Sequence, residues 1–255
     1  WRNINILTEK IAEHRLPVAD YAPEISYLEN ELSSSEIRKG WRLLWDGKSN
    51  KGWRAAKGNQ FPTKGWVIEN GILSVEASDG GESRNGGDIV TEDLFSNFEL
   101  SVDFKLTKGA NSGIKYFVDP ALNKANGSAI GLEFQVLDDK NHPDAEQGKN
   151  GNRTVGSLYD LIRAENNDAG CRVKNFKVVN QWNNARIVVQ NGHVEHWLNH
   201  VKVVSYDRFS QAFKALVEKS KYEKWDNFGR LSEGNILLQD HGDKVSFKNI
   251  KVKEF

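Results

Sequence analysis

The chain has 255 residues, enough for one large all-β domain or two domains of ordinary size. Its 35 basic and 35 acidic residues cancel, which excludes an overall field that would attract nucleic acid or an anionic membrane. A single cysteine, Cys171, excludes an intrachain disulfide and a cysteine-based metal site, and no apolar run is long enough to span a membrane. We therefore expect a neutral or small ligand. The many aromatic residues and the 22 glycines are typical of β-sandwiches that handle sugars or peptides.

Residues 1–39 differ in character from the rest of the chain and are predicted to form an N-terminal arm. Within this arm, Ser33 and Glu36 match a capping box, which predicts one short turn of helix before Gly40. From Trp41 onward the apolar residues recur with a period of two, the pattern of β-strands. One domain is therefore expected over residues 40–255.

Many short strands are predicted within this domain. They cover residues 41–46, a hairpin at 67–75, and then 98–106, 111–118, 130–136, 155–162, 186–190, 193–198, 201–206, 235–240 and 244–253. Asn70-Gly71 and Asn191-Gly192 are the strongest hairpin signals, and Asn199-His200 continues a three-stranded meander. Apolar residues spaced as in a helix follow at 209–217. Without βαβ alternation, these elements predict an all-β jelly-roll sandwich of two antiparallel sheets with one short late helix.

The strand at 130–136 and the loop after it are the strongest candidates for a functional site. Glu133 and Gln135 lie two residues apart, so their side chains point the same way at a spacing of about 7 Å. They line either a concave, substrate-facing sheet or a solvated outer face. The loop from Asp138 to Thr154 is long and polar, and long loops in compact domains tend to be functional.

Titratable residues in this loop allow several interpretations. His142 and Asp144, on either side of a proline, could form a general base with its orienting partner, or a metal site with Asp138 or Glu133. Asp138 could equally form only a turn, because aspartate bonds its own backbone well.

Two further histidines lie on late strands. His196 shares a strand face with Val194 and Leu198, which is consistent either with a hydrogen-bonded structural residue or with a catalyst; Trp197 points to the opposite face. Gln239 and His241 share a side, giving a polar pair.

The sequence contains no phosphate-binding loop, GxSxG or HExxH motif, which argues against phosphoryl transfer, serine hydrolysis of the usual kind and zinc proteolysis.

Several motifs together resemble one bacterial family, the 3-keto-disaccharide hydrolase domain. In chain order they are GWRLLWDGKSNKGW, SGIKYF, GLEFQVLDDKNHPDA, NRTVGSLYDLI, HVEHWLN and ILLQDHGDKVSFKNIKV. The resemblance covers about residues 40–255. One departure is His200, where the family usually has glycine after HWLN.

The resemblance implies a concanavalin A-like jelly roll and substrates that are glycosides already oxidised to a ketone at C3. It also implies export to the periplasm or cell surface. Jelly-roll glucanases carry the strand motif E-x-D-x-x-E, but here the middle position is Gln135, which argues against a paired-carboxylate mechanism on this strand. A C3 ketone makes the C2 proton acidic, so a base can remove it and the C1 substituent can leave by elimination, with water adding afterwards.

The expected enzyme is thus a 3-keto-glycoside hydrolase or lyase that uses Glu133 or a histidine as the base. The catalytic candidates are Glu133, His142, His196 and His241, and the substrate-binding candidates are Gln135, Asp138, Asp144, Lys115, Arg153, Tyr159, Trp197 and Gln239. No cofactor is expected for certain, although a divalent cation could polarise the ketone. The alternatives are a non-catalytic carbohydrate-binding module that uses the same concave sheet, with tryptophans stacking on sugar rings, or a structural domain without a pocket.

Overall fold

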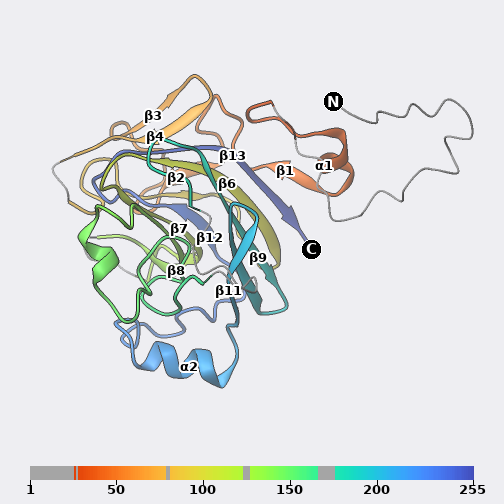
Figure 1. The fold of residues 1–255 in the computed structure, drawn as a ribbon. Coiled ribbons are helices and arrows are strands. Elements are labelled where there is room, and N and C mark those ends of the chain that lie inside the picture. Colours follow the sequence, from red (N-terminus) through yellow and green to blue (C-terminus); the bar gives the residue numbers. More distant parts are fainter. Residues whose placement is uncertain (1–25, 27, 79–80, 123–126, 166–175) are drawn as a thin grey trace, which may run out of the picture.

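In the computed structural model, the segments whose apolar residues recur with a period of two are strands. These strands form two antiparallel β-sheets that pack face to face (Figure 1). The structure describes residues 26, 28–78, 81–122, 127–165 and 176–255. Cys171 and most of the predicted N-terminal arm lie outside these residues. The prediction of an all-β jelly roll is confirmed. Among the residues described, no helix is long and apolar enough to cross a membrane.

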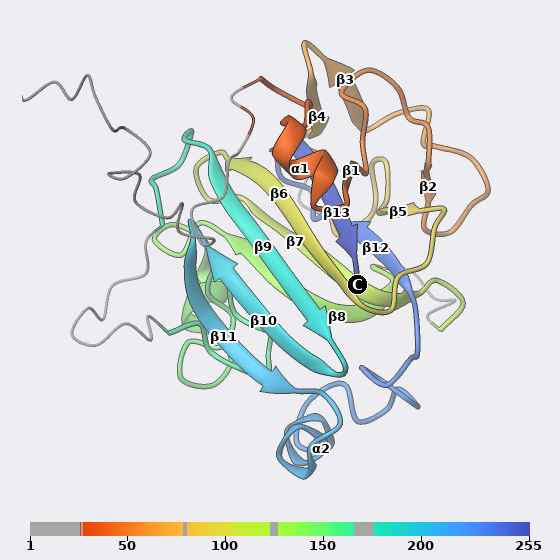
Figure 2. The same ribbon diagram turned by 90° about the vertical axis from the view of Figure 1, so that its right-hand side faces the viewer.

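The larger sheet contains eight strands. Their order is β11-β10-β9-β6-β13-β4-β3, and β1 also pairs with β13. The strands are β1 (Trp41–Leu43), β3 (Trp66–Glu69), β4 (Ile72–Val75), β6 (Phe98–Leu106), β9 (Asn183–Gln190), β10 (His193–Leu198), β11 (Val201–Asp207) and β13 (Val245–Glu254). Figure 2 shows this sheet in front of the smaller one.

The smaller sheet has five strands in the order β2-β5-β12-β7-β8. They are β2 (Trp53–Ala55), β5 (Ile89–Thr91), β7 (Asn111–Asp119), β8 (Ile130–Leu137) and β12 (Asn235–Leu238). The core fills the space between the two sheets. Its largest fully buried side chains include Phe98, Phe104, Tyr116, Phe134 and Phe247.

The three predicted two-residue turns all join neighbouring strands of the larger sheet. Asn70-Gly71 and Asn191-Gly192 have positive φ at both residues, as the type I′ hairpin turn requires. Asn199 and His200 also have positive φ, of 47° and 69°. His200 therefore occupies a left-handed position that glycine would fill without strain, and the hairpin between β10 and β11 still forms.

Two short helices and a single turn of 3-10 helix complete the described fold. Helix α1 (Ser34–Arg38) begins at the predicted Ser33 and Glu36 capping box. Helix α2 (Gln211–Glu218) is capped by Ser210 and lies at one end of the sandwich (Figure 1). The 3-10 turn, Pro143–Glu146, interrupts the long polar loop.

The prediction of a strand at residues 155–162 is wrong. These residues form turns, with only isolated bridges from Leu158 to Phe134 and to Ile162. They hydrogen-bond instead along the free edge of β8, where the Ser157 carbonyl oxygen accepts from the Gln135 N–H at 3.1 Å. The apolar residues in this segment pack onto the core, so their alternation reflects burial rather than extended pairing.

Candidate active site

Three neighbouring strands, β12, β7 and β8, present polar side chains on one face of the smaller sheet. The register places Lys115 of β7 beside Glu133 of β8, and Gly113 beside Gln135. Gln239, just after β12, joins this row because its N–H donates to the Gly113 carbonyl oxygen at 3.0 Å. The opposite face of these strands packs into the core, so the polar row faces away from it. Glu133 and Gln135 thus lie on the face where the site was predicted.

This polar row forms the floor of a cleft of about 260 Å³. A segment that follows α2, residues 221–225, supplies part of the wall. The residues that line the cleft are Glu82, Asn111, Lys115, Gly127, Ser128, Ile130, Glu133, Gln135, Tyr159, Lys221, Tyr222, Lys224, Trp225, Gln239 and His241. The cleft therefore combines an ionisable floor with an aromatic wall.

Glu133 is the central acidic residue of the floor. It is only 5% exposed, and its carboxylate Oε2 lies 3.6 Å from Lys115 Nζ. Burial raises the pKa of Glu133, and the opposing charge of Lys115 limits the rise. Gly113 makes this position possible, since a Cβ there would come within 2.2 Å of Glu133 Oε1. A buried carboxyl with a raised pKa beside a fixed cation is a candidate for proton transfer.

A buried hydrogen-bond network holds Lys115 in place. Its Nζ donates to Ser128 Oγ at 2.5 Å and to the Ala129 carbonyl oxygen at 3.2 Å. Ser128 Oγ in turn donates to Asp88, a buried carboxyl that also accepts from the Ala129 N–H at 3.1 Å. Because two carboxylates flank Lys115, its ammonium group is fixed at the floor between Glu133 and the Ser128–Asp88 pair.

Lys221 and Tyr159 stand above the floor. Lys221 Nζ lies 4.3 Å from the centroid of the Tyr159 ring, within cation–π distance. Partial burial of the amino group lowers the pKa of Lys221, against the opposing effect of the Glu133 charge. Lys221 is therefore a second group in the cleft with a shifted pKa, and it releases its proton more readily than an ordinary lysine does.

An ionic network outside the cleft supports Tyr159. The Tyr159 hydroxyl donates to Asp144 Oδ2 at 2.9 Å, and Arg153 Nη1 donates to Asp144 Oδ1 at 2.8 Å. Arg153 Nε also donates to Asp160 Oδ1 at 2.7 Å. Asp144 and Arg153 were predicted to bind substrate, but neither lines the cleft. Their contacts show that they position the ring of Tyr159, which does line it.

Of the two histidines near the cleft, His241 lines it and His142 does not. Their ring centroids are 6.3 Å apart and the rings are nearly perpendicular. His142 Nδ1 accepts from the Asp144 N–H at 3.1 Å and caps the 3-10 turn, and burial lowers its pKa. His241 is thus the better placed of the two for contact with a substrate.

Two glutamine amides complete the floor. The amide of Gln135 satisfies its neighbours best with its nitrogen facing Glu133 Oε1, at 3.1 Å. Gln239 Nε2 donates to Glu82 Oε1 at 3.1 Å, while the buried Gln239 Oε1 has no hydrogen-bond partner among the described residues. Gln135 therefore acts as a neutral neighbour of Glu133, where a glucanase motif would place a second carboxylate.

Three further predicted site residues, besides Asp144, Arg153 and His142, do not line the cleft. Asp138 is buried in its own loop, where Oδ2 accepts from the Gly109 N–H at 2.8 Å and from Asn141 Nδ2 at 2.7 Å, so it acts as a turn residue. Trp197 does not line the cleft; its Nε1 donates to Glu195 on β10 and its ring packs against Arg186 on β9. For these two residues the prediction of substrate contact is not supported.

His196 is the third of these residues, and it lies between the two sheets. It is fully buried, with Nε2 2.8 Å from the Tyr116 hydroxyl and Nδ1 3.0 Å from the Gly156 carbonyl oxygen. Burial lowers its pKa to about 4. The side chain lies in the core and does not line the cleft, a position that favours the structural interpretation of His196 over the catalytic one.

His196 should make the fold sensitive to acid. Because its folded pKa lies below the ordinary 6.5, the unfolded chain takes up this proton first, and stability falls as the pH drops from about 6.5 to about 4. The full effect is about 3 kcal/mol. We expect the stability difference between wild type and His196→Gln, measured by urea unfolding, to narrow by about this amount across that range. A difference between wild type and His196→Gln that stays constant across this pH range would contradict this account.

The donor set at the floor does not favour a metal ion. Within the described parts of the chain, no group of three or more His, Cys, Asp or Glu residues is placed to hold one. The floor carboxylate Glu133 is already paired with the buried ammonium group of Lys115. A cation beside Glu133 would be repelled by Lys115, so no metal step enters the chemistry derived below.

Some residues of the cleft were missed by sequence reasoning. Lys221, Tyr222 and Trp225 come from a polar segment that has neither strand nor helix periodicity. The available signal was the alternation of lysines with aromatic residues in KYEKW, a composition that suits sugar recognition. Glu82 and Ser128 lie in loops, and only the fold brings them to the sheet.

Comparisons with known proteins identify the relatives of this chain. The sequence profile of the 3-keto-alpha-glucoside-1,2-lyase-like domain family matches residues 40–253. A 3-keto-disaccharide hydrolase from Bacteroides thetaiotaomicron is 38% identical over 234 residues, which cover 84% of this chain and 78% of that protein.

Solved structures support the same assignment. A protein from Parabacteroides distasonis, assigned provisionally to the glycosyl hydrolases, matches with a TM-score of 0.76 and 29% identity over 89% of this chain and all of that one. A second such protein from the same organism has a TM-score of 0.61 and 26% identity, over 84% of this chain and 99% of that one. The relatives support a glycosidase-like enzyme function. The chain belongs to the 3-keto-alpha-glucoside-1,2-lyase-like domain family.

Proposed function

We propose that the protein cleaves 3-keto-glycosides in the cleft on the smaller sheet. The observation that carries this proposal is the buried Glu133 carboxyl beside the buried Lys115 ammonium group, 3.6 Å apart at the floor of an aromatic-walled cleft. A base next to a fixed positive charge is what removal of a proton adjacent to a ketone requires.

The first step removes the C2 proton of the oxidised sugar. The Glu133 carboxylate takes the proton, and the C–H electron pair moves toward C3, so negative charge develops on the keto oxygen. Lys115 stabilises this charge, because its ammonium group is preorganised by Ser128 and shielded from water. Tyr159 and Trp225 give the sugar ring an aromatic surface to pack against.

The second step expels the substituent at C1. The enolate electrons form the C1–C2 double bond, the C1–O bond breaks, and the leaving oxygen takes a proton from His241 or Lys221, which both line the cleft. Water then adds to C1, C2 recovers a proton, and the products are a free 3-keto sugar and the released alcohol. The lowered pKa of Lys221 makes it a stronger acid than an ordinary lysine, which favours its role as proton donor.

The proposal is tested by incubating the protein with a 3-keto disaccharide and with its unoxidised parent, with and without a chelator, and measuring the free sugar released. We expect cleavage of the oxidised substrate only, because the parent has no acidic C2 proton. Cleavage of neither would refute the enzyme proposal. Loss of activity with chelator would show that the reaction takes a divalent cation, contrary to the donor set at the floor.

The alternative is a carbohydrate-binding module without catalysis, and the aromatic wall of Tyr159, Tyr222 and Trp225 is the observation in its favour. A module of that kind does not need buried ionisable groups at its floor, whereas Glu133 and Lys115 incur a desolvation cost there. Saturable binding of the 3-keto disaccharide without release of sugar would support this alternative.

Export to the periplasm or cell surface is proposed from the resemblance alone, and cell fractionation tests it.

A further inference from the structure

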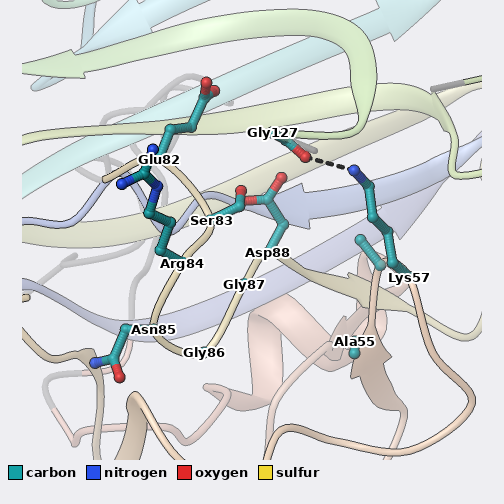
Figure 3. Close-up of a pocket in the computed structure, with 11 residues that line it drawn as sticks. Ala55, Lys57, Glu82, Ser83, Arg84, Asn85, Gly86, Gly87, Asp88 and Gly127 are labelled. Atoms are coloured by element: carbon teal, nitrogen blue, oxygen red, sulfur yellow. Dashed lines mark hydrogen bonds between the residues drawn. The ribbon is translucent and has the colours of Figure 1, made fainter. Parts of the chain in front are cut away.

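A second, larger cavity lies next to the cleft. Its volume is about 810 Å³, and it shares Glu82 and Gly127 with the cleft over Glu133. The residues that line it are Ala55, Ala56, Lys57, Glu82, Ser83, Arg84, Asn85, Gly86, Gly87, Asp88 and Gly127. Figure 3 shows Lys57 extending toward Gly127, while the loop of residues 82–88 curves along the other side. The two cavities therefore adjoin at Glu82 and Gly127.

The volumes of the two cavities indicate how a substrate divides between them. Sites for small molecules commonly measure about 300–1,000 Å³. The cleft over Glu133, at about 260 Å³, is slightly smaller than this range and suits one sugar ring. A disaccharide must extend beyond it, and the larger cavity adjoins it at Glu82.

The lining of the larger cavity identifies the chemistry that it fits. Lys57, Arg84 and Asn85 contribute hydrogen-bond donors, and Glu82 contributes acceptors. Two basic and two acidic side chains, counting the buried Asp88, leave the lining without net charge. Among the described residues that line this cavity, none is aromatic, in contrast to the wall of the neighbouring cleft. A neutral ligand rich in hydroxyl groups fits this surface better than an aromatic one.

The loop that forms this cavity is anchored to the same network that holds Lys115. Asp88 accepts from the Asp240 N–H and from Ser83 Oγ, both at 3.0 Å. Asp240 Oδ2 accepts from the N–H groups of Gly86 and Gly87, at 3.0 and 2.9 Å. The loop is thus fixed to the end of β12 beside the floor of the cleft, as a binding surface continuous with the reaction centre requires.

We infer that the larger cavity binds the leaving group of the reaction, and that this group is a second sugar or another neutral polyol. The inference rests on the proposed function. The oxidised ring lies over Glu133, the glycosidic bond crosses beside Glu82, and the departing ring lies between Lys57 and the loop of residues 82–88. Arg84, which lines this cavity, supplies donors to the hydroxyl groups of that ring.

The test compares a 3-keto disaccharide with the methyl 3-keto-glucoside of the same anomeric configuration. A methyl leaving group is too small to fill the larger cavity. In Ala55→Trp, the bulky ring should occupy the cavity, so the ratio of kcat/KM for the disaccharide to kcat/KM for the methyl glycoside should fall at least tenfold. Asn85→Trp, at a partly exposed loop position, provides a second obstruction with less risk to folding. Gln190→Trp, on the larger sheet, is the matched control and should keep the wild-type ratio.

The outcomes separate the two proposals. If wild type cleaves both substrates and the obstructing variants keep its ratio, the leaving-group site is refuted while the proposed function stands. If wild type cleaves neither substrate, the proposed function fails and the inference fails with it. A drop in the ratio confined to Ala55→Trp and Asn85→Trp supports both.

Discussion

Replacing Glu133 with glutamine is expected to lower kcat on a 3-keto disaccharide by about 10²–10⁴-fold, the usual contribution of a general base. The amide has nearly the same shape as the carboxyl but cannot accept the C2 proton. Because burial raises the pKa of Glu133, the wild-type rate should fall on the acidic side at a pH above the ordinary carboxyl value of 4.5. This acidic limb should be absent from whatever activity the variant retains.

The matched control for this substitution is Glu99→Gln. Glu99 lies on β6 of the other sheet and is paired with Arg186 at 2.5 Å. The substitution therefore removes a carboxylate from a strand without changing the cleft. Its turnover should stay within about twofold of wild type, as expected for a site that makes no contact with the reacting atoms. If Glu133→Gln and His241→Ala both kept normal turnover, this site would have to be abandoned.

Replacing Lys115 with methionine is expected to lower kcat by about 10²–10³-fold, the typical loss when a group that stabilises a developing oxyanion is removed. It should also shift the acidic limb to higher pH, because Lys115 is the main charge that favours the ionised form of Glu133. Without this cation, the raised pKa of Glu133 rises further, and a higher pH is needed to ionise the base. Steady-state kinetics across the pH range measure both effects.

The same substitution should destabilise the fold by about 3–5 kcal/mol, because it leaves buried carboxyls at Glu133 and Asp88 without their cation. Kinetics are therefore compared under conditions in which circular dichroism shows the variant folded. Lys105→Met is the matched control, since Lys105 packs over the Trp182 ring on the other sheet. An acidic limb that stays in place or moves to lower pH in Lys115→Met would contradict the assigned role of Lys115.

Much of the fold could be predicted because local patterns and tertiary packing agree. The alternation Phe98, Leu100, Val102 marks a strand with one buried face, and the asparagine-initiated turns fix where the meander reverses. The segment 155–162 shows the limit of this reasoning. Its apolar residues are buried as in a strand, but its hydrogen bonds go to the edge of β8, and periodicity alone cannot distinguish these cases.

The candidate site was only partly predictable because its residues come from distant parts of the chain. Glu133 and Gln135 share a face on one strand, so their convergence follows from the period of two. Lys221 and Trp225 are brought to Glu133 by the path of the chain after α2, and the composition of KYEKW carries no information about this contact. For His196, the sequence could not distinguish an inward from an outward face, and packing against Tyr116 and Phe134 decided it.

The central claim is that Glu133 removes the C2 proton and that cleavage proceeds by elimination followed by addition of water. The most direct measurement is cleavage of a 3-keto disaccharide in deuterium oxide, with mass and NMR analysis of C2 in the released 3-keto sugar. The product incubated alone corrects for spontaneous exchange. We predict deuterium at C2 of the product from wild-type enzyme, because the proton that returns to C2 comes from solvent. A product that keeps its original hydrogen at C2, together with equal rates for substrates that carry hydrogen or deuterium at C2, would show direct hydrolysis at C1 and contradict this mechanism.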